Sequence, residues 1–152
     1  MTQEEKELIY KDLCGRLLYG VIVQQSAKYP KGHSMYNVAD KWDTEPHDFK
    51  IIGVEGTNTL ITDKRKEERT YAKGIVSSPI TICIYNGLTK QVSIPYLRPM
   101  SSMTEEEKND LFQLMGRGTD IERIDFYISH HFDYRGLIPM GLALEAPKDM
   151  YQ

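Results

Sequence analysis

The sequence repeats one helix-start signature, and this repetition constrains the fold more than any other feature. A threonine is followed three residues later by a glutamate, so the hydroxyl can accept from the third helical amide while the carboxylate accepts from the threonine amide. The pattern predicts helices over residues 3–17, 104–115 and 120–131. The three pairs are Thr2 with Glu5, Thr104 with Glu107 and Thr119 with Glu122.

Each predicted helix carries apolar residues at helical spacing, which predicts one buried face. Gly15 is a candidate C-terminal stop of the first helix, and the second helix is expected to end at Gly116. The apolar positions are Leu8, Ile9, Leu13 and Leu17 in the first helix, Leu111, Phe112, Leu114 and Met115 in the second, and Ile121, Ile124, Ile128 and Phe132 in the third.

Between the first two helices the apolar period shortens to about two, which indicates short strands within residues 19–94. For the hairpin over 78–95, two registers are compared: a two-residue Asn86-Gly87 turn, and a three-residue loop that pairs Ile84 with Leu88. We prefer the three-residue loop because it places more apolar residues on one side of the hairpin. Residues 27–48 are turn-rich. The pattern leaves open whether one further strand forms near Met35 to Ala39.

These elements predict one α+β domain over residues 1–152. Its expected core is a small antiparallel β-meander or open barrel of about five to six strands, packed by helices from both termini. Residues 134–144 are expected to form a short turn or helix.

The composition favours an ordinary globular chain. It has 152 residues, of which 40% are hydrophobic and 27% charged, so global disorder is not expected. The net charge of −3 gives no overall attraction to nucleic acid or anionic membranes. No apolar run is long enough for a signal peptide or a membrane span, so we expect a cytoplasmic protein. Cys14 and Cys83 match no zinc or redox spacing and are expected to be buried thiols.

The stretch "ISHHFDYRGL" holds the residues that most resemble a catalytic site, namely His130, His131 and Asp133. Adjacent residues of a helix point about 100° apart, so the two histidines are poorly placed to share one metal ion. A site that also recruited His33 or His47 stays open. The structural interpretation is a helix end, where the histidines meet free carbonyls and Asp133 caps the next turn.

The best nucleic-acid candidate is the charged segment "DKRKEERTYAKG". Its acids favour a solvated turn between strands over a basic contact surface. Outside it, "MGRGTD" fits a helix end and a helix start better than a phosphate loop, and Arg98 is expected to pair with a nearby carboxylate. The basic residues of the segment are Lys64, Arg65, Lys66, Arg69 and Lys73.

Three motifs resemble a family of small proteins from gut bacterial genomes, often near prophage or mobile-element genes. They are "EEKELIYKDLCGRLLYGV", "IPYLRPMSSMTEEEK" and "HHFDYRGLIPMGLALEAP", the last followed by "DMY" after Lys148. Residues 24–80 carry no such resemblance. Family members often have proline at Leu18 and "EK" at Pro139-Met140. The resemblance implies no catalytic residue, since the family's function is unassigned, and Pro139 is expected to shorten or break the segment around it.

The sequence therefore predicts a small cytoplasmic protein that binds another protein in an accessory role linked to phage or mobile elements. No cofactor is predicted, nucleic acid and membrane are not favoured as partners, and the oligomeric state stays open. The alternatives are a metal-dependent hydrolase that uses His130, His131 and Asp133, and a nucleic-acid binder that uses the segment from Lys64 to Lys73.

Overall fold

The fold is α+β, as predicted: it combines helices with an open sheet of six mostly antiparallel strands in the order β4-β3-β2-β1-β5-β6. The computed structural model describes residues 1–70 and 74–151, with side chains other than those of residue 42 and residues 64–81. The chain divides into two compact units, residues 1–95 and 96–152, which are treated separately below. The single domain over 1–152 stays a prediction.

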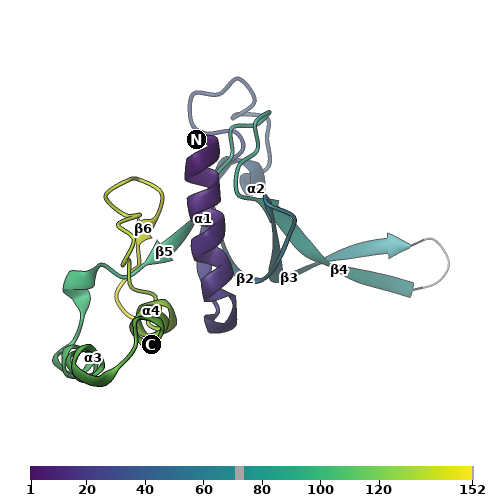
Figure 1. Ribbon diagram of the computed structural model, residues 1–152. Helices are drawn as coiled ribbons and strands as arrows, with labels where there is room; N and C mark the ends of the chain where they lie inside the picture. Colours follow the sequence, from purple (N-terminus) through teal and green to yellow (C-terminus); the bar gives the residue numbers. More distant parts are fainter. Residues whose placement is uncertain (71–73, 152) are drawn as a thin grey trace. The chain divides into compact units, whose positions relative to one another are not determined.

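The first unit holds one long helix and most of the sheet (Figure 1). β5 begins in this unit, where it pairs with β1, and continues into the second unit. The elements are α1 (Gln3–Arg16), η1 (Leu17–Tyr19), β1 (Ile22–Gln25), α2 (Lys41–Thr44), β2 (His47–Glu55), β3 (Thr59–Thr70), β4 (Gly74–Cys83) and β5 (Ser93–Leu97).

One face of this sheet is apolar and buried. Residues directly opposite each other on antiparallel strands point to the same side, so buried pairs identify the core face. Along β2 the intervening residues are exposed, as the period of two requires. The core face is lined by the buried pairs Val23 with Phe49, Ile51 with Thr62 and Leu60 with Ile82.

The predicted hairpin register is wrong. Tyr85 pairs with Val92, and the Asn86 amide donates to the Gln91 carbonyl, so the connection is longer than three residues. The Asn86 side chain explains the difference, because its Oδ1 accepts from the amides of Leu88 and Thr89 and so stabilises a wider turn. Leu88, predicted to be on the apolar side, is 97% exposed.

Two local alternatives that the sequence left open are not realised in this unit. Gly15 does not end α1, which continues to Arg16, and Gly20 instead takes the left-handed conformation (φ 73°) after η1. The segment from Met35 to Ala39 forms turns rather than a strand, with the amides of Val38 and Ala39 both bonded to the Met35 carbonyl.

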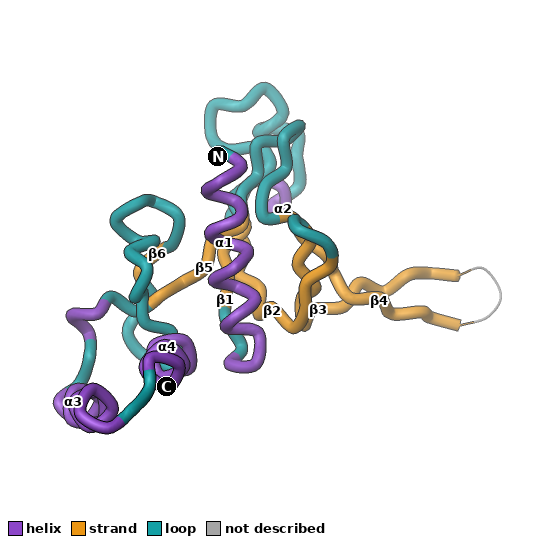
Figure 2. The backbone as a smooth tube through the Cα atoms, in the orientation of Figure 1, coloured by secondary structure: helices purple, strands orange, loops and turns teal. Residues whose placement is uncertain are grey.

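The second unit contains the helices α3 (Glu105–Arg117) and α4 (Asp120–Ser129) and a short parallel pairing of β6 (Leu144–Glu145) with the end of β5. Figure 2 shows where these elements follow one another along the chain. η2 (Met100–Ser102) follows β5, and residues 134–143 form turns without a helix, as the predicted turn allowed. α3 continues one residue beyond the expected stop at Gly116, and α4 ends two residues before the predicted end.

All three capping boxes form. In each box the glutamate amide lies 3.1 to 3.2 Å from the threonine hydroxyl, and the glutamate carboxylate returns to the threonine amide. A C-cap follows α3 at Gly118, whose amide donates to Leu114, and Thr119 then starts α4. The segment "MGRGTD" is thus a helix end followed by a helix start, as predicted.

The predicted core face of the third helix is wrong at Ile121 and Ile124 and right at Phe132, which is fully buried. Ile121 is 79% exposed and Ile124 is 43% exposed, whereas Phe126 is buried. Phe126 packs with Met103 and Phe132, and partly buried residues of α3 cover this cluster. Phe112 and Met115, predicted to be buried in α3, are exposed as well. Among residues 1–70 and 74–151, no helix has the length and apolarity to cross a membrane.

Candidate functional site

His130 ends α4 and bonds back to it. Its Nδ1 lies 2.9 Å from the Phe126 carbonyl oxygen, and because a carbonyl only accepts, the proton must sit on Nδ1. The imidazole also packs on the Phe126 ring, with ring centroids 4.3 Å apart. This is the helix-end role that the sequence predicted for a histidine in this position.

His131 turns away from its neighbour. It takes the left-handed conformation with φ 58° and is buried, and its ring stacks on the Tyr151 ring with centroids 3.7 Å apart. Its carbonyl oxygen accepts from the Arg98 amide. A left-handed backbone at a non-glycine residue costs about 1–3 kcal/mol, and here it redirects the chain between α4 and Phe132.

Asp133 caps the turn that follows. Its Oδ1 accepts from the Leu137 amide at 2.7 Å and its Oδ2 from the Ile138 amide at 2.8 Å. The side chain is buried, so these bonds satisfy a carboxylate that water cannot reach easily. The sequence predicted this capping role, and both carboxylate oxygens are engaged in it.

Arg98 contacts both α3 and the segment that follows α4. Its guanidinium donates to both carboxylate oxygens of Glu107, at 2.7 and 2.9 Å, and lies over the Phe132 ring at 4.3 Å. The hydrogen bonds and charge of Arg98 lower the pKa of Glu107 to about 2. The expected pairing of Arg98 with a local carboxylate is confirmed.

A cleft lies beside residues of chemical interest in each unit. In the second unit a cleft of about 390 Å³ lies between the Arg98–Glu107 pair and the segment from Glu145 to Tyr151. In the first unit a cleft of about 400 Å³ is lined by His47, Asp43 and the half-buried free thiol of Cys83. Sequence reasoning missed this grouping because its members are far apart along the chain.

Neither cleft assembles a metal site in the described part of the chain. Within residues 1–70 and 74–151, no three side chains among His, Cys, Asp and Glu gather closely enough to hold a metal ion. The open possibility that His33 or His47 joins the His130 corner therefore gains no support. In the first unit, Asp43 instead lies 3.9 Å from the Lys28 ammonium.

The basic segment is only partly described. The backbone up to Thr70 belongs to β3 and pairs with β4, with Lys66 opposite Ser78 and Arg69 opposite Ile75. The part of this segment up to Thr70 is therefore strand and not the expected turn. The side chains of Lys64, Arg65, Lys66 and Arg69, and all of Lys73, lie outside the described residues, so the nucleic-acid prediction stays a prediction.

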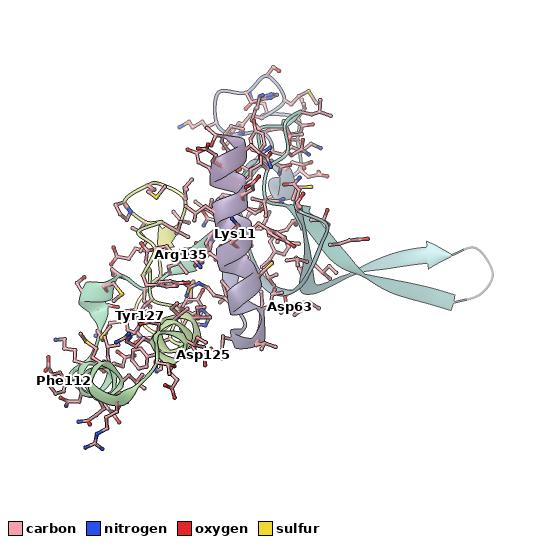
Figure 3. All side chains as sticks on the ribbon, viewed as in Figure 1. Lys11, Asp63, Phe112, Asp125, Tyr127 and Arg135 are labelled. Carbon is pink, nitrogen blue, oxygen red and sulfur yellow. The ribbon has the colours of Figure 1, made fainter. Side chains whose placement is uncertain are left out.

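The most conspicuous unexplained surface is the outer side of α4. The exposed Ile121 and Ile124 and the half-buried Ile128, hereafter the α4 stripe, recur at helical spacing opposite the buried Phe126. Figure 3 labels Asp125 and Tyr127 on this helix and Phe112 on α3. An amphipathic helix normally turns its apolar side inward, and α4 presents an apolar side outward as well.

The comparisons with known proteins add no assignment. No protein-family model, curated protein or solved structure matches the chain.

Proposed function

We propose that this chain acts by binding another protein, and that the α4 stripe is the contact surface. The observation that carries the proposal is the exposure of Ile121 and Ile124 on a helix whose opposite side is already packed. Burying one isoleucine side chain contributes a free energy of roughly 1.5–3 kcal/mol. The exposed isoleucines of α4 do not contribute it in the chain alone. A partner that covers the stripe would recover this free energy.

The spacing of the stripe suits recognition by a helical surface. Ile121, Ile124 and Ile128 occupy positions i, i+3 and i+7, which is the anchor spacing of a helix that packs into an apolar groove or against a second helix. The capping box at Thr119 and Glu122 fixes the start of α4, so the first anchor stands on an ordered turn. A preordered helix loses less conformational entropy on binding.

An accessory role linked to phage or mobile elements, in the cytoplasm, is part of the proposal and rests on the resemblance of the "HHFDYRGL" and "PYLRPMSSMTEEEK" segments. The hydrolase alternative is not proposed, because Nδ1 of His130 and both carboxylate oxygens of Asp133 bond to main-chain groups. Nucleic-acid binding is not proposed either, since its residues are those whose side chains are not described.

Site-specific photo-crosslinking tests the proposal. A photoreactive amino acid is placed at Ile121 or, as the matched control, at Ile52, an exposed isoleucine of β2. In cells that carry the gene, we expect one discrete protein adduct from position 121 and none of that mass from position 52. The adduct should disappear in an Ile124→Asn background. No adduct at 121, or the same adducts from both positions, would contradict the proposal.

A further inference from the structure

The cleft of the first unit continues the core face of the sheet as a polar surface. Gln25 lies opposite His47 on the neighbouring strand, and the next pair on that side is Val23 with Phe49. Because side chains alternate along a strand, both pairs point to the same side of the sheet. Val23 and Phe49 are buried, whereas Gln25 and His47 are half-buried and line the cleft. The cleft therefore has polar walls above the apolar floor that Phe49 and Ile82 form.

Hydrogen bonds between loops hold the walls of this cleft. The Ser26 amide donates to the Val92 carbonyl, and the Ser26 hydroxyl accepts from the Val92 amide. The Ser26 carbonyl also accepts from the Gln91 side chain. The loops around Ser26 and Gln91 accordingly lie side by side (Figure 2). Ser93 adds a bond from its hydroxyl to the Cys83 carbonyl at 2.7 Å. Walls that are already ordered lose less conformational entropy when a ligand binds.

Two opposite charges stand in the lining without a hydrogen bond between them. The Lys28 ammonium and the Asp43 carboxylate are 3.9 Å apart, longer than the roughly 2.7–3.2 Å of a hydrogen bond. Their side chains are 36% and 34% exposed. An exposed ion pair of this kind contributes little to stability. A ligand that carries both charges can therefore bind each partner at small cost to the fold.

Two side-chain amides of the lining have polar atoms to offer a ligand. The Asn86 Oδ1 accepts from the amides of Leu88 and Thr89, which leaves its Nδ2 as a donor. The Gln25 side chain makes no hydrogen bond with any residue in the part of the chain that the structure describes. A few polar groups above an apolar floor are typical of a site for a small molecule.

From these observations we infer that the cleft binds a free α-amino acid with an apolar side chain. The ammonium group of the ligand pairs with Asp43, and its carboxylate pairs with Lys28. The apolar side chain of the ligand covers Phe49 and Ile82 at the floor. A ligand with one charge fits less well, because it attracts one member of the Lys28–Asp43 pair and repels the other. The volume of about 400 Å³ is that of a small-ligand site.

Derivatives that lack one charge test this inference on the full chain. The probes are L-phenylalanine, L-leucine, N-acetyl-phenylalanine without the ammonium group, phenylalanine amide without the carboxylate, and glycine without an apolar side chain. Binding is measured by isothermal titration calorimetry. We expect L-phenylalanine or L-leucine to bind about tenfold or more tightly than the last three probes, since each of these loses a charged or an apolar contact.

Protein variants locate the ligand. Lys28→Gln and Asp43→Asn should each weaken binding of the amino acid about tenfold. Matched changes in the same segment, Lys41→Gln and Asp40→Asn, alter exposed charges outside the cleft lining and should change the affinity less than twofold. Gln25→Phe fills the cleft without removing a charge and should abolish binding. Far-ultraviolet circular dichroism checks that each variant keeps the fold of the parent.

Three results would overturn the inference. They are no binding of either L-phenylalanine or L-leucine, equal binding of phenylalanine and its two derivatives, and equal affinity of the Lys28 and Asp43 variants and their controls. The cleft belongs to the first unit and the α4 stripe to the second. Photo-crosslinking at Ile121 therefore tests the proposed function independently of these results.

Discussion

Two helices of this chain invert the usual distribution of polar and apolar side chains in opposite ways. α1 turns Asp12 and Arg16 toward its buried side, and α4 turns Ile121 and Ile124 toward its exposed side. The spacing of residues decides which side chains share a side of a helix. The rest of the molecule determines whether that side is buried or exposed. It buries the Asp12 side of α1 and leaves the Ile121 side of α4 exposed.

The buried pair of α1 is well satisfied. Arg16 donates from Nε to one oxygen of Asp12 at 2.7 Å and from an Nη to the other at 3.1 Å, and both side chains are fully buried. The pair spans one helical turn beside Ile9 and Leu13. Because its desolvation offsets most of its attraction, we regard the pair as setting how α1 docks rather than as a large net source of stability.

The largest expected effect is therefore the loss of one member of this pair. Asp12→Ala leaves the Arg16 charge buried without its carboxylate and should lower the free energy of unfolding by about 3–5 kcal/mol. The double change Asp12→Leu with Arg16→Met removes both charges at similar volume and should stay within about 1–2 kcal/mol of the parent. Urea unfolding followed by circular dichroism measures both. Equal losses in the single and double variants would contradict this account of α1.

Asp133, after α4, is a buried carboxylate that bonds main-chain amides and forms no ion pair with the residues that the structure describes. Its replacement shows whether losing such a carboxylate costs as much stability as losing Asp12. Asp133→Ala removes the acceptor for the Leu137 and Ile138 amides and should cost about 2–3 kcal/mol, less than Asp12→Ala. Asp133→Asn keeps one oxygen and should lose about half as much. The measurement is again urea unfolding, together with hydrogen exchange of the two amides, which should accelerate. Unchanged exchange would show that the turn does not need its cap.

The ion pair of the second unit gives a pH-dependent counterpart to the pair of α1. Arg98 holds the pKa of Glu107 at about 2 in the folded chain, below its ordinary value of 4.5. A lowered carboxyl pKa stabilises the fold above pH 4.5, and this contribution is lost as the pH falls from 4.5 toward 2. The Glu107 side chain is 14% exposed, so screening reduces the contribution to about 1–2 kcal/mol.

Removing the carboxylate should remove this pH dependence. The free energy of unfolding of Glu107→Gln is expected to fall less between pH 5 and pH 2 than that of the parent, by about 1–2 kcal/mol. Glu106→Gln changes the exposed neighbour and should follow the parent curve closely. Parallel curves for Glu107→Gln and the parent would contradict the link between this ion pair and acid stability.

The difference between interactions within one turn and packing by distant residues explains what the sequence could predict. The capping boxes form as predicted because Thr2 and Glu5, and their counterparts, interact within one turn. Asp133 was likewise recognisable as a cap. The burial of Arg16 had no local signal, since an aspartate four residues before an arginine is also typical of a solvated helix surface. The hairpin register depended on the Asn86 side chain, which apolar pairing ignores.

The smallest expected effect comes from the α4 stripe. It decides whether α4 exposes apolar side chains while α1 buries charged ones. Ile121→Asn changes a side chain that is 79% exposed, so the free energy of unfolding should change by no more than about 0.5 kcal/mol. Phe126→Ala, on the packed side of the same helix, should cost about 3–5 kcal/mol. Thermal and urea unfolding compare the two. If Ile121→Asn instead costs more than about 1.5 kcal/mol, the stripe is part of the core, α4 follows the ordinary polarity, and the argument for an external partner falls with it.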